Sequence, residues 1–252
     1  MEPVRLRQPR WKAKFYPSLR ARIRGKSVAG EATPMNTRKA PLWDLPVRLF
    51  HWSLPLLLVT AWVSAEYDAM DVHEWCGYTV LVLVGFRIVW GFIGSRHARF
   101  SDFLRPPAAA LRYLRGMEPE RPGHNPAGGW SVIAMLTLLA AQGVTGLFNS
   151  DDLSFEGPLV RALDRDSVDA LAAWHEPNFW LLLSLVALHI GTVLFYLLRR
   201  QKNLIAPMLN GGESSAAGAP RPLWLALVVI AVLSGLLYWG LSLAPPPPPP
   251  FL

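Results

Sequence analysis

The chain contains six histidines, and the spacing of two of them suggests metal-binding chemistry. His175 and His189 are 14 residues apart. On one helix that spacing turns through about 1400°, about 40° short of four full turns, and rises about 21 Å. Both imidazoles therefore project from the same face of a helix at two different depths. This arrangement predicts two stacked sites that share one helix.

The elements that would carry these side chains are long apolar stretches. Apolar residues make up 52% of the 252 residues and charged residues only 17%, against about a quarter in soluble domains. Five stretches approach or exceed the roughly 18–20 apolar residues that a transmembrane helix needs; they lie at approximately 47–65, 75–94, 130–148, 178–198 and 223–243. A backbone in lipid must satisfy its own hydrogen bonds, so these stretches should be helices. We therefore predict an all-α, polytopic membrane protein.

The charges of the loops predict its orientation. Loop 66–72 has three acids and no base, whereas segment 95–127 carries six Arg against three acids. Basic loops stay in the cytoplasm, so we expect a cytoplasmic N-terminus and a C-terminus on the outer side of the membrane. The high pI, near 9.9, follows from basic residues beside membrane spans. Membrane lipid is therefore an expected partner and nucleic acid is not.

This topology places a second histidine at the depth of each histidine on the fourth span. His51 lies level with His189 near the cytoplasmic side, and His73 lies level with His175 near the outer side; we name them the inner pair and the outer pair. Two imidazoles in a helical bundle suit bis-His haem iron, whereas two nitrogen ligands underfill zinc. A single membrane histidine can instead form an interhelical hydrogen bond. Four histidines at two matched depths favour two b-type haems.

Three further residues are candidates for contact with the haems. Arg87 follows His73 by 14 residues, so it shares that face of the helix and lies about 21 Å deeper, level with the inner pair. A buried guanidinium needs a counter-charge, and a haem propionate would supply it through bidentate contacts. Arg48 is a second candidate, and for both arginines the alternative is snorkelling to the headgroups. Gly77 lies one turn after His73, where a flat macrocycle needs clearance.

The rest of the chain divides into segments of different character. The predicted parts are a basic, disordered leader at 1–40, a four-helix dihaem domain at 41–205, a linker at 206–222, a fifth transmembrane helix at 223–243 and a proline-rich tail at 244–252. Translation could begin at Met1 or at Met35. The single Cys76 excludes an internal disulfide and a cysteine-based metal cluster within the chain. His97 and His124 fall in the basic segment between the second and third spans, where we expect surface or loop roles.

The chain resembles the bacterial cytochrome b561 family in WDLPVRLFHW (43–52), HEWCGYTVLVLVGFRIVWGFIGSRHARFSDF (73–103), PGHNPAGGW (122–130) and the spacing of WHE and LHI (174–190). This family includes the b-type cytochrome subunit of membrane nickel–iron hydrogenases. The resemblance covers roughly residues 40–205 and implies a four-helix bundle that passes electrons between the quinone pool and a partner. It further implies that two b haems are held by His51, His73, His175 and His189, with Arg87 beside the inner haem.

The predicted function is that of an integral membrane dihaem cytochrome b. Its partners would be quinone, as an exchangeable substrate, and a periplasmic or membrane redox protein such as a c-type cytochrome, a hydrogenase or a dehydrogenase subunit. An iron with two histidine ligands has no open position, which favours electron transfer over oxygenation, so no catalytic residue is expected. One alternative is a membrane-anchor subunit of a redox complex with a mainly structural role. A divalent-metal transporter is disfavoured because the spans contain almost no carboxylates.

Overall fold

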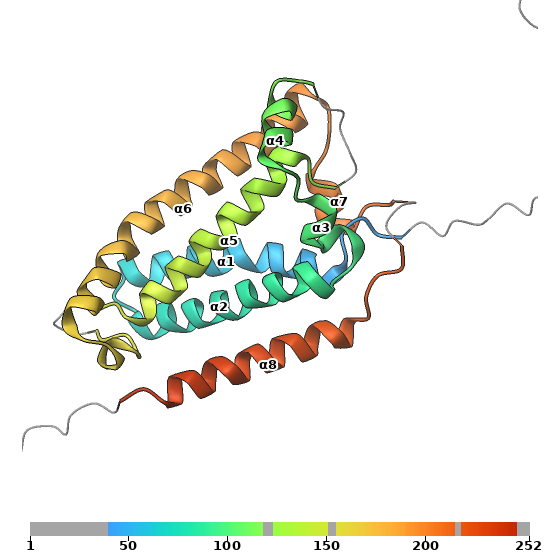
Figure 1. Cartoon of the computed structure of the whole chain (residues 1–252). Coiled ribbons are helices and arrows are strands. Elements are labelled where there is room, and N and C mark those ends of the chain that lie inside the picture. The colour runs from blue at the N-terminus through green and yellow to red at the C-terminus, as the bar shows by residue number, and fades with distance from the viewer. Residues whose placement is uncertain (1–39, 118–122, 151–154, 215–217, 246–252) are drawn as a thin grey trace, which may run out of the picture. The chain divides into compact units, whose positions relative to one another are not determined.

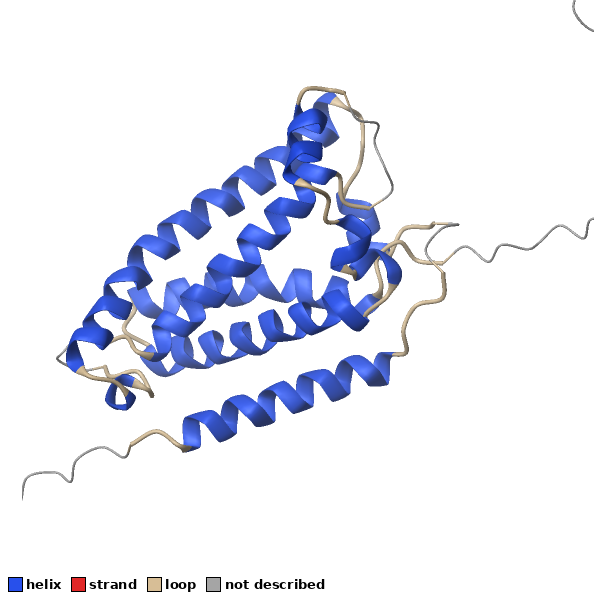
Figure 2. Cartoon of the chain, in the orientation of Figure 1, coloured by secondary structure: helices blue, strands red, loops and turns tan. Residues whose placement is uncertain are grey.

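The computed structural model describes residues 40–117, 123–150, 155–214 and 218–245. Residues 1–39 of the predicted leader and 246–252 of the predicted tail lie outside the described residues. The described part is built from helices without any β-strand, apart from isolated bridges between Ala40 and Ser214 and between Ser150 and Glu156 (Figure 2). The predicted all-α class is confirmed.

Five helices are long and apolar enough to cross a membrane. They are α1 (Leu45–Glu66), α2 (Met70–Ile93), α5 (Pro126–Leu147), α6 (Arg165–Arg199) and α8 (Leu223–Ser242). Each covers one of the five predicted apolar stretches, so the chain is a multi-pass integral membrane protein. Helix α6 differs from the prediction at its start, because it begins 13 residues before position 178 and runs through Pro177.

Side-chain caps explain where three of the spanning helices begin. Asp44 accepts a hydrogen bond from the backbone N–H of Val47 at the start of α1, where Pro46 occupies the first turn. Asn125 and Asp164 cap α5 and α6 in the same way. A capping side chain satisfies one of the N–H groups that the first turn leaves without a partner. The first span therefore begins directly after the capping residue Asp44.

Short helices connect the spans. They are η2 (Arg96–Ala98), α3 (Phe100–Phe103), α4 (Pro107–Leu114), η3 (Val160–Ala162) and α7 (Ile205–Asn210). Helices α3, α4 and α7 lie at the end of the bundle where α1 begins (Figure 1). Ala40 and Ser214 exchange two backbone hydrogen bonds there, so the first part of the predicted linker, which also contains α7, is structured.

The spanning helices pack in an order that leaves α6 at one side. Helix α1 packs on α2, α5 packs on both α2 and α6, and α8 packs on α2 (Figure 1). Trp90 and Phe86 of α2 are the most deeply buried large side chains. Within α6 only Val168, Asn178 and Leu182 are buried. Leu182 is seven residues from both His175 and His189, so the face of α6 that carries the histidines is the one turned into the protein.

Candidate functional site

The structure brings the four predicted histidines together in two pairs. The ring centroids of His51 and His189 are 6.3 Å apart with 57° between the ring planes. Those of His73 and His175 are also 6.3 Å apart, with 69° between the planes. These are the two pairings that the predicted depths indicated. Each pair joins α6 to a different helix, α1 for the inner pair and α2 for the outer pair.

The separation within each pair suits one metal ion between two imidazoles. Two metal–nitrogen bonds of about 2 Å account for about 4 Å of the 6.3 Å between ring centroids. The remainder is the distance from each centroid to its own nitrogen, which lies on the rim of the ring. Among the described residues no group of three or more His, Cys, Asp or Glu side chains could hold a metal ion. The pairs therefore suit a metal whose remaining ligands come from a macrocycle.

Hydrogen bonds fix the tautomers of the outer pair. The Nδ1 atom of His73 lies 2.8 Å from the carbonyl oxygen of Ala61, and a carbonyl only accepts, so Nδ1 carries the proton. The Thr145 hydroxyl donates to the carbonyl of Ala141, so its oxygen accepts from Nδ1 of His175 at 3.0 Å. Both rings are thereby left with a lone pair on Nε2. Metal-binding histidines commonly donate their second ring N–H in this way.

Two amide side chains complete the surroundings of His175. Asn178 donates to the side-chain oxygen of Gln142 at 2.6 Å and to the carbonyl of Leu138 at 3.0 Å. The side-chain nitrogen of Gln142 therefore faces His175 and lies 3.1 Å from Nε2. A metal that bonded to this Nε2 would take the place of the Gln142 amide. These side chains, together with Thr145, had no sequence signal that linked them to His175.

The inner pair has fewer protein partners. The Nδ1 atom of His51 is buried and has no hydrogen-bond partner in the structure. A buried polar atom without a partner is uncommon in folded proteins and calls for an explanation such as a bound group. The two pairs therefore differ, since the outer rings are held by neighbouring groups and the His51 ring is not.

The glycines near the histidine pairs differ in how much open space lies beside them. A Cβ atom added at Gly77 or at Gly191 would meet nothing within 4 Å. A Cβ at Gly143 would lie 2.6 Å from the Leu81 side chain, and one at Gly146 would lie 3.1 Å from the His175 ring. Gly143 and Gly146 thus allow close packing against neighbouring side chains. Gly77, one turn after His73, lies beside open space, as a flat ligand on that face would require.

Arg87 is buried near the inner end of the bundle, with 2% of its surface exposed. It donates to the carbonyl oxygen of Ala98 at 2.8 Å, and its guanidinium lies 5.7 Å from the centre of the Phe100 ring. It is also attracted to the carboxylate of Asp44, which accepts a hydrogen bond from the indole of Trp90. Arg87 therefore does not snorkel to the surface. The Asp44 carboxylate is a nearby counter-charge that the sequence did not indicate.

Arg48 has a different environment. Its guanidinium donates to the carbonyl oxygens of Met208 and Leu209 at the end of α7. Trp52 donates to the Met208 carbonyl as well. A cation close to the C-terminal carbonyls of a helix is electrostatically favourable. In the structure Arg48 thus ties α1 to α7.

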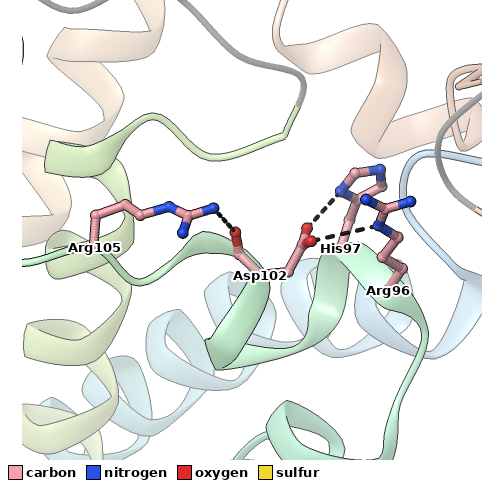
Figure 3. A network of polar contacts seen from close by, with 4 residues as sticks. All are labelled: Arg96, His97, Asp102 and Arg105. Carbon is pink, nitrogen blue, oxygen red and sulfur yellow. Dashed lines mark hydrogen bonds and ion pairs between the residues drawn. The ribbon is translucent and has the colours of Figure 1, made fainter.

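Of the surface and loop roles expected for His97, the surface role is wrong, although the residue does lie in the connection between α2 and α5. His97 in η2 is 8% exposed, and its Nδ1 atom lies 2.9 Å from the Asp102 carboxylate (Figure 3). Arg96 forms an ion pair with the same carboxylate, and Arg105 donates to the backbone carbonyl of Asp102. The Nε2 atom of His97 is buried without a hydrogen-bond partner. The loop between α2 and α5 folds back onto the bundle, and this long-range packing buries the ring.

His124 is also drawn into the protein. Its ring packs against Trp43 and Phe103, each with a centroid separation of 4.7 Å, and its Nδ1 atom is buried without a hydrogen-bond partner. Burial and then the positive charge of Arg87 lower the pKa of His124 to about 3, so the imidazole is neutral near pH 7. His124 lies within electrostatic reach of both histidines of the inner pair. Sequence reasoning missed this placement, because no local pattern distinguishes His124 from a loop histidine.

Comparison with known proteins identifies the family. The family described as prokaryotic cytochrome b561 matches residues 42–211, well over half of the chain. The chain belongs to this family. The prediction from the sequence motifs is therefore confirmed.

Curated relatives of this cytochrome b561 carry names that agree with this assignment. It is 25% identical over 208 residues to a "Probable Ni/Fe-hydrogenase B-type cytochrome subunit" of Bradyrhizobium diazoefficiens, with 68% of this chain and 84% of the relative covered. Proteins with the same name from Azotobacter chroococcum and Azotobacter vinelandii are 23% and 24% identical, with 68% of this chain and 86% of each relative covered. No solved structure has significant similarity to the chain. The protein is therefore a membrane b-type cytochrome of electron transfer, and its cofactor is haem b.

The donor set of the structure fits this cofactor. Each pair offers two imidazole nitrogens at a suitable separation, and no group of three or more His, Cys, Asp or Glu side chains forms a competing metal site among the described residues. Two imidazoles on opposite sides of a planar macrocycle satisfy the axial positions of b-type haem iron.

Proposed function

We propose that this cytochrome holds two b haems and carries electrons across the bacterial inner membrane between quinone and a redox partner protein. The main support for this proposal is that α6 presents two histidines on one face. The ring centroid of each lies 6.3 Å from that of a histidine on another helix. His51 and His189 would hold the inner haem, and His73 and His175 the outer haem. Haem b, when bound, supplies an iron that gains or loses one electron.

The protein side chains position the two haems and exclude other chemistry. Two histidine ligands per iron leave no open coordination position for oxygen or substrate. The rise along α6 from His175 to His189 is about 21 Å, so the two sites lie near opposite faces of the bilayer, whose hydrocarbon core is about 30 Å thick. Thr145 and the Ala61 carbonyl hold the outer imidazoles with Nε2 available, and an iron held by His175 would take the place of the Gln142 amide.

Charge supports the proposed orientation, and the names of the relatives support the proposed partner. The basic residues of segment 95–127 place the inner pair toward the cytoplasm, by the rule that basic loops stay inside. The curated relatives are named as hydrogenase cytochrome subunits, so a hydrogenase is the first partner to test. Quinone would exchange electrons with one haem near a membrane surface. The competing function is a membrane anchor whose haems take no part in electron flow.

Ligand variants test the pairing. We expect His51→Ala and His189→Ala to lose the same haem, and His73→Ala and His175→Ala to lose the other, in reduced-minus-oxidised b-type spectra of the purified protein. Wild-type protein should contain two haems per chain. If His51→Ala and His189→Ala lost different haems, or if the protein were colourless and bound zinc, the proposal would be refuted.

A glycine pair provides a matched control. Gly77→Leu should fill the open space one turn from His73, so that the haem content falls to about one per chain and the outer spectrum disappears. Gly235 in α8 also has nothing within 4 Å of an added Cβ, and Gly235→Leu should retain both haems. Reduction of the haems by a quinol analogue then separates the electron carrier from the anchor, because an anchor would show no such reduction.

A further inference from the structure

Three nitrogen-bearing side chains from separate segments converge near the inner pair. Arg87 comes from α2, His97 from η2 and His124 from the turn before α5. The Arg87 guanidinium lies 5.9 Å from the centre of the Phe103 ring, and the His124 ring lies 4.7 Å from the same ring. Arg87 also donates to the carbonyl of Ala98, the residue next to His97. Arg87 and His124 thus both lie against Phe103, and the hydrogen bond of Arg87 to Ala98 brings the Arg87 guanidinium beside the His97 segment.

This cluster has buried nitrogen atoms that the protein does not satisfy. The Nε2 atom of His97 and the Nδ1 atom of His124 are both buried without a hydrogen-bond partner. His97 is more than nine-tenths buried. Gly123 has a positive φ of 85°. A Cβ atom added at Gly123 would lie 3.7 Å from Nδ1 of His97. The turn therefore places the residue before His124 beside the His97 ring.

The carboxylates near the cluster already have partners. Asp44 accepts from the Val47 N–H and from the Trp90 indole. Asp102 accepts from Nδ1 of His97 and pairs with Arg96. The guanidinium of Arg87 has five N–H donors, and one bond goes to Ala98. Two buried imidazole nitrogens near the Arg87 cation are therefore left without a protein partner, while the neighbouring carboxylates are already occupied. Such a site suits a bound carboxylate.

The position of the cluster indicates which carboxylate this is. His124 packs against Trp43, directly before the Asp44 cap of α1, and His51 lies about two turns into the same helix. A group bound between the inner histidines would thus present its edge to the cluster. We propose that Arg87, His97 and His124 bind the propionate carboxylates of the inner haem. This inference rests on the proposed function, in which the inner pair holds a haem.

The hydrogen bond to Asp102 determines how His97 takes part. Because Asp102 accepts from Nδ1–H, the Nε2 atom can donate to a propionate only when His97 is an imidazolium. That cation would lie between two carboxylates, Asp102 on one side and the propionate on the other, with Arg96 and Arg87 as the neighbouring positive groups. His124 and Arg87 donate without a change of protonation. Asp102 is therefore a positioning residue for His97 (Figure 3).

Potentiometric titration of the purified dihaem protein between pH 5 and pH 9 tests the proposal. His124→Phe keeps a ring against Trp43 and Phe103 but removes the nitrogen atoms. We expect the inner-haem potential to fall, because a propionate charge that is less neutralised favours ferric iron, and we expect the outer-haem potential to stay unchanged. His124→Gln, which keeps an N–H donor, should restore part of the potential. His97→Phe should act in the same direction.

Arg87→Gln provides a second readout. Loss of an opposite charge raises the pKa of a carboxyl group by about 1–3 units, so the pH at which the inner-haem potential becomes pH-dependent should rise by that amount. The carboxylate bands of the infrared redox-difference spectrum should shift with it. Arg115→Gln removes an arginine at the exposed end of α4 and serves as the control for loss of one positive charge, with both potentials expected to stay as in wild type.

The outcomes separate this proposal from the proposed function. If both haems are present and His124→Phe, His97→Phe and Arg87→Gln all leave the inner-haem potential as in wild type, the propionate assignment is overturned while the dihaem function stands. If wild-type protein lacks the haem that depends on His51 and His189, the proposed function fails first. If Arg115→Gln lowers the inner potential as much as His124→Phe does, the effect is one of general charge and the assignment is again overturned.

Discussion

Asp44 joins the start of α1 to the core of α2, and its substitution is expected to destabilise the protein strongly. One carboxylate oxygen accepts from the Val47 N–H at 2.9 Å, and the other accepts from the Trp90 indole N–H at 2.9 Å. Asp44 is 4% exposed and Trp90 is fully buried. Asp44→Ala therefore removes a helix cap and leaves an indole N–H buried without an acceptor.

The magnitude follows from these two losses. Replacing an N-cap Asp by Ala costs typically about 1 kcal/mol. A buried donor left without a partner costs about 1–3 kcal/mol, so we expect a total loss of about 3 kcal/mol. At about 2–4 °C per kcal/mol for a chain of this size, the apparent melting temperature should fall by about 6–12 °C. Asp44→Asn retains a capping oxygen and should lose less.

The measurement is the thermal loss of helical circular dichroism of the detergent-solubilised protein at a fixed heating rate. Asp164→Ala is the matched control, because Asp164 caps α6 through the Ser167 N–H at 3.0 Å but is exposed. Its loss of stability should be much smaller than that of Asp44→Ala. If the two alanine variants melted at the same temperature, the indole hydrogen bond would contribute nothing and the reasoning would be refuted.

Three other predictions concern packing, ligand orientation and pH. A Cβ at Gly91 would lie 2.1 Å from the Phe100 ring, so Gly91→Ala should cost about 1–3 kcal/mol through overpacking, and an unchanged melting temperature would contradict it. Thr145→Val removes the hydroxyl that lies 3.0 Å from Nδ1 of His175. We expect the outer haem to remain bound with a raised reduction potential, because the imidazole becomes a weaker electron donor to the iron. An unchanged potential would show that the hydroxyl has no influence. Hydrogen bonds from the backbone N–H and the hydroxyl of Ser167 lower the pKa of Asp164. The Asp164 carboxylate therefore stabilises the folded protein above the unfolded-state pKa of about 3.9. This contribution is lost as the pH falls through the lower folded-state pKa. Asp164→Asn should therefore be less stable than wild type at pH 7, and urea titrations should show the difference shrinking below about pH 4; a difference that stayed constant would contradict the assignment.

Much of the candidate site could be predicted because it depends on local geometry and on depth in the membrane. The 14-residue spacing of His175 and His189 defines one face of α6 through the fixed turn and rise of a helix. The lengths of the apolar stretches define where each helix enters the bilayer, so His51 and His73 could be assigned to the two depths. The ring pairs at 6.3 Å agree with that reasoning, while their role as haem ligands remains a proposal.

Contacts between residues far apart in the chain could not be predicted in this way. Arg48 binds carbonyls about 160 residues away, which no local pattern indicates. His97 and His124 fall in a polar, basic loop, and the sequence therefore predicted surface or loop roles for both. Their burial depends on how that loop packs against the core, which periodicity does not describe.

The sequence by itself determined the all-α membrane class, the five spans, the family and the two depths of the histidines, because each of these follows from hydropathy, helical repeat or motif. Only the tertiary structure decided what surrounds the histidines. The Thr145 hydroxyl and the Gln142 amide lie at His175, and the buried Arg87 and His97 and the half-buried His124 lie toward the inner pair. The physical reason is that hydrogen-bond partners and burial are set by packing between helices and loops, and packing depends on contacts across the whole chain.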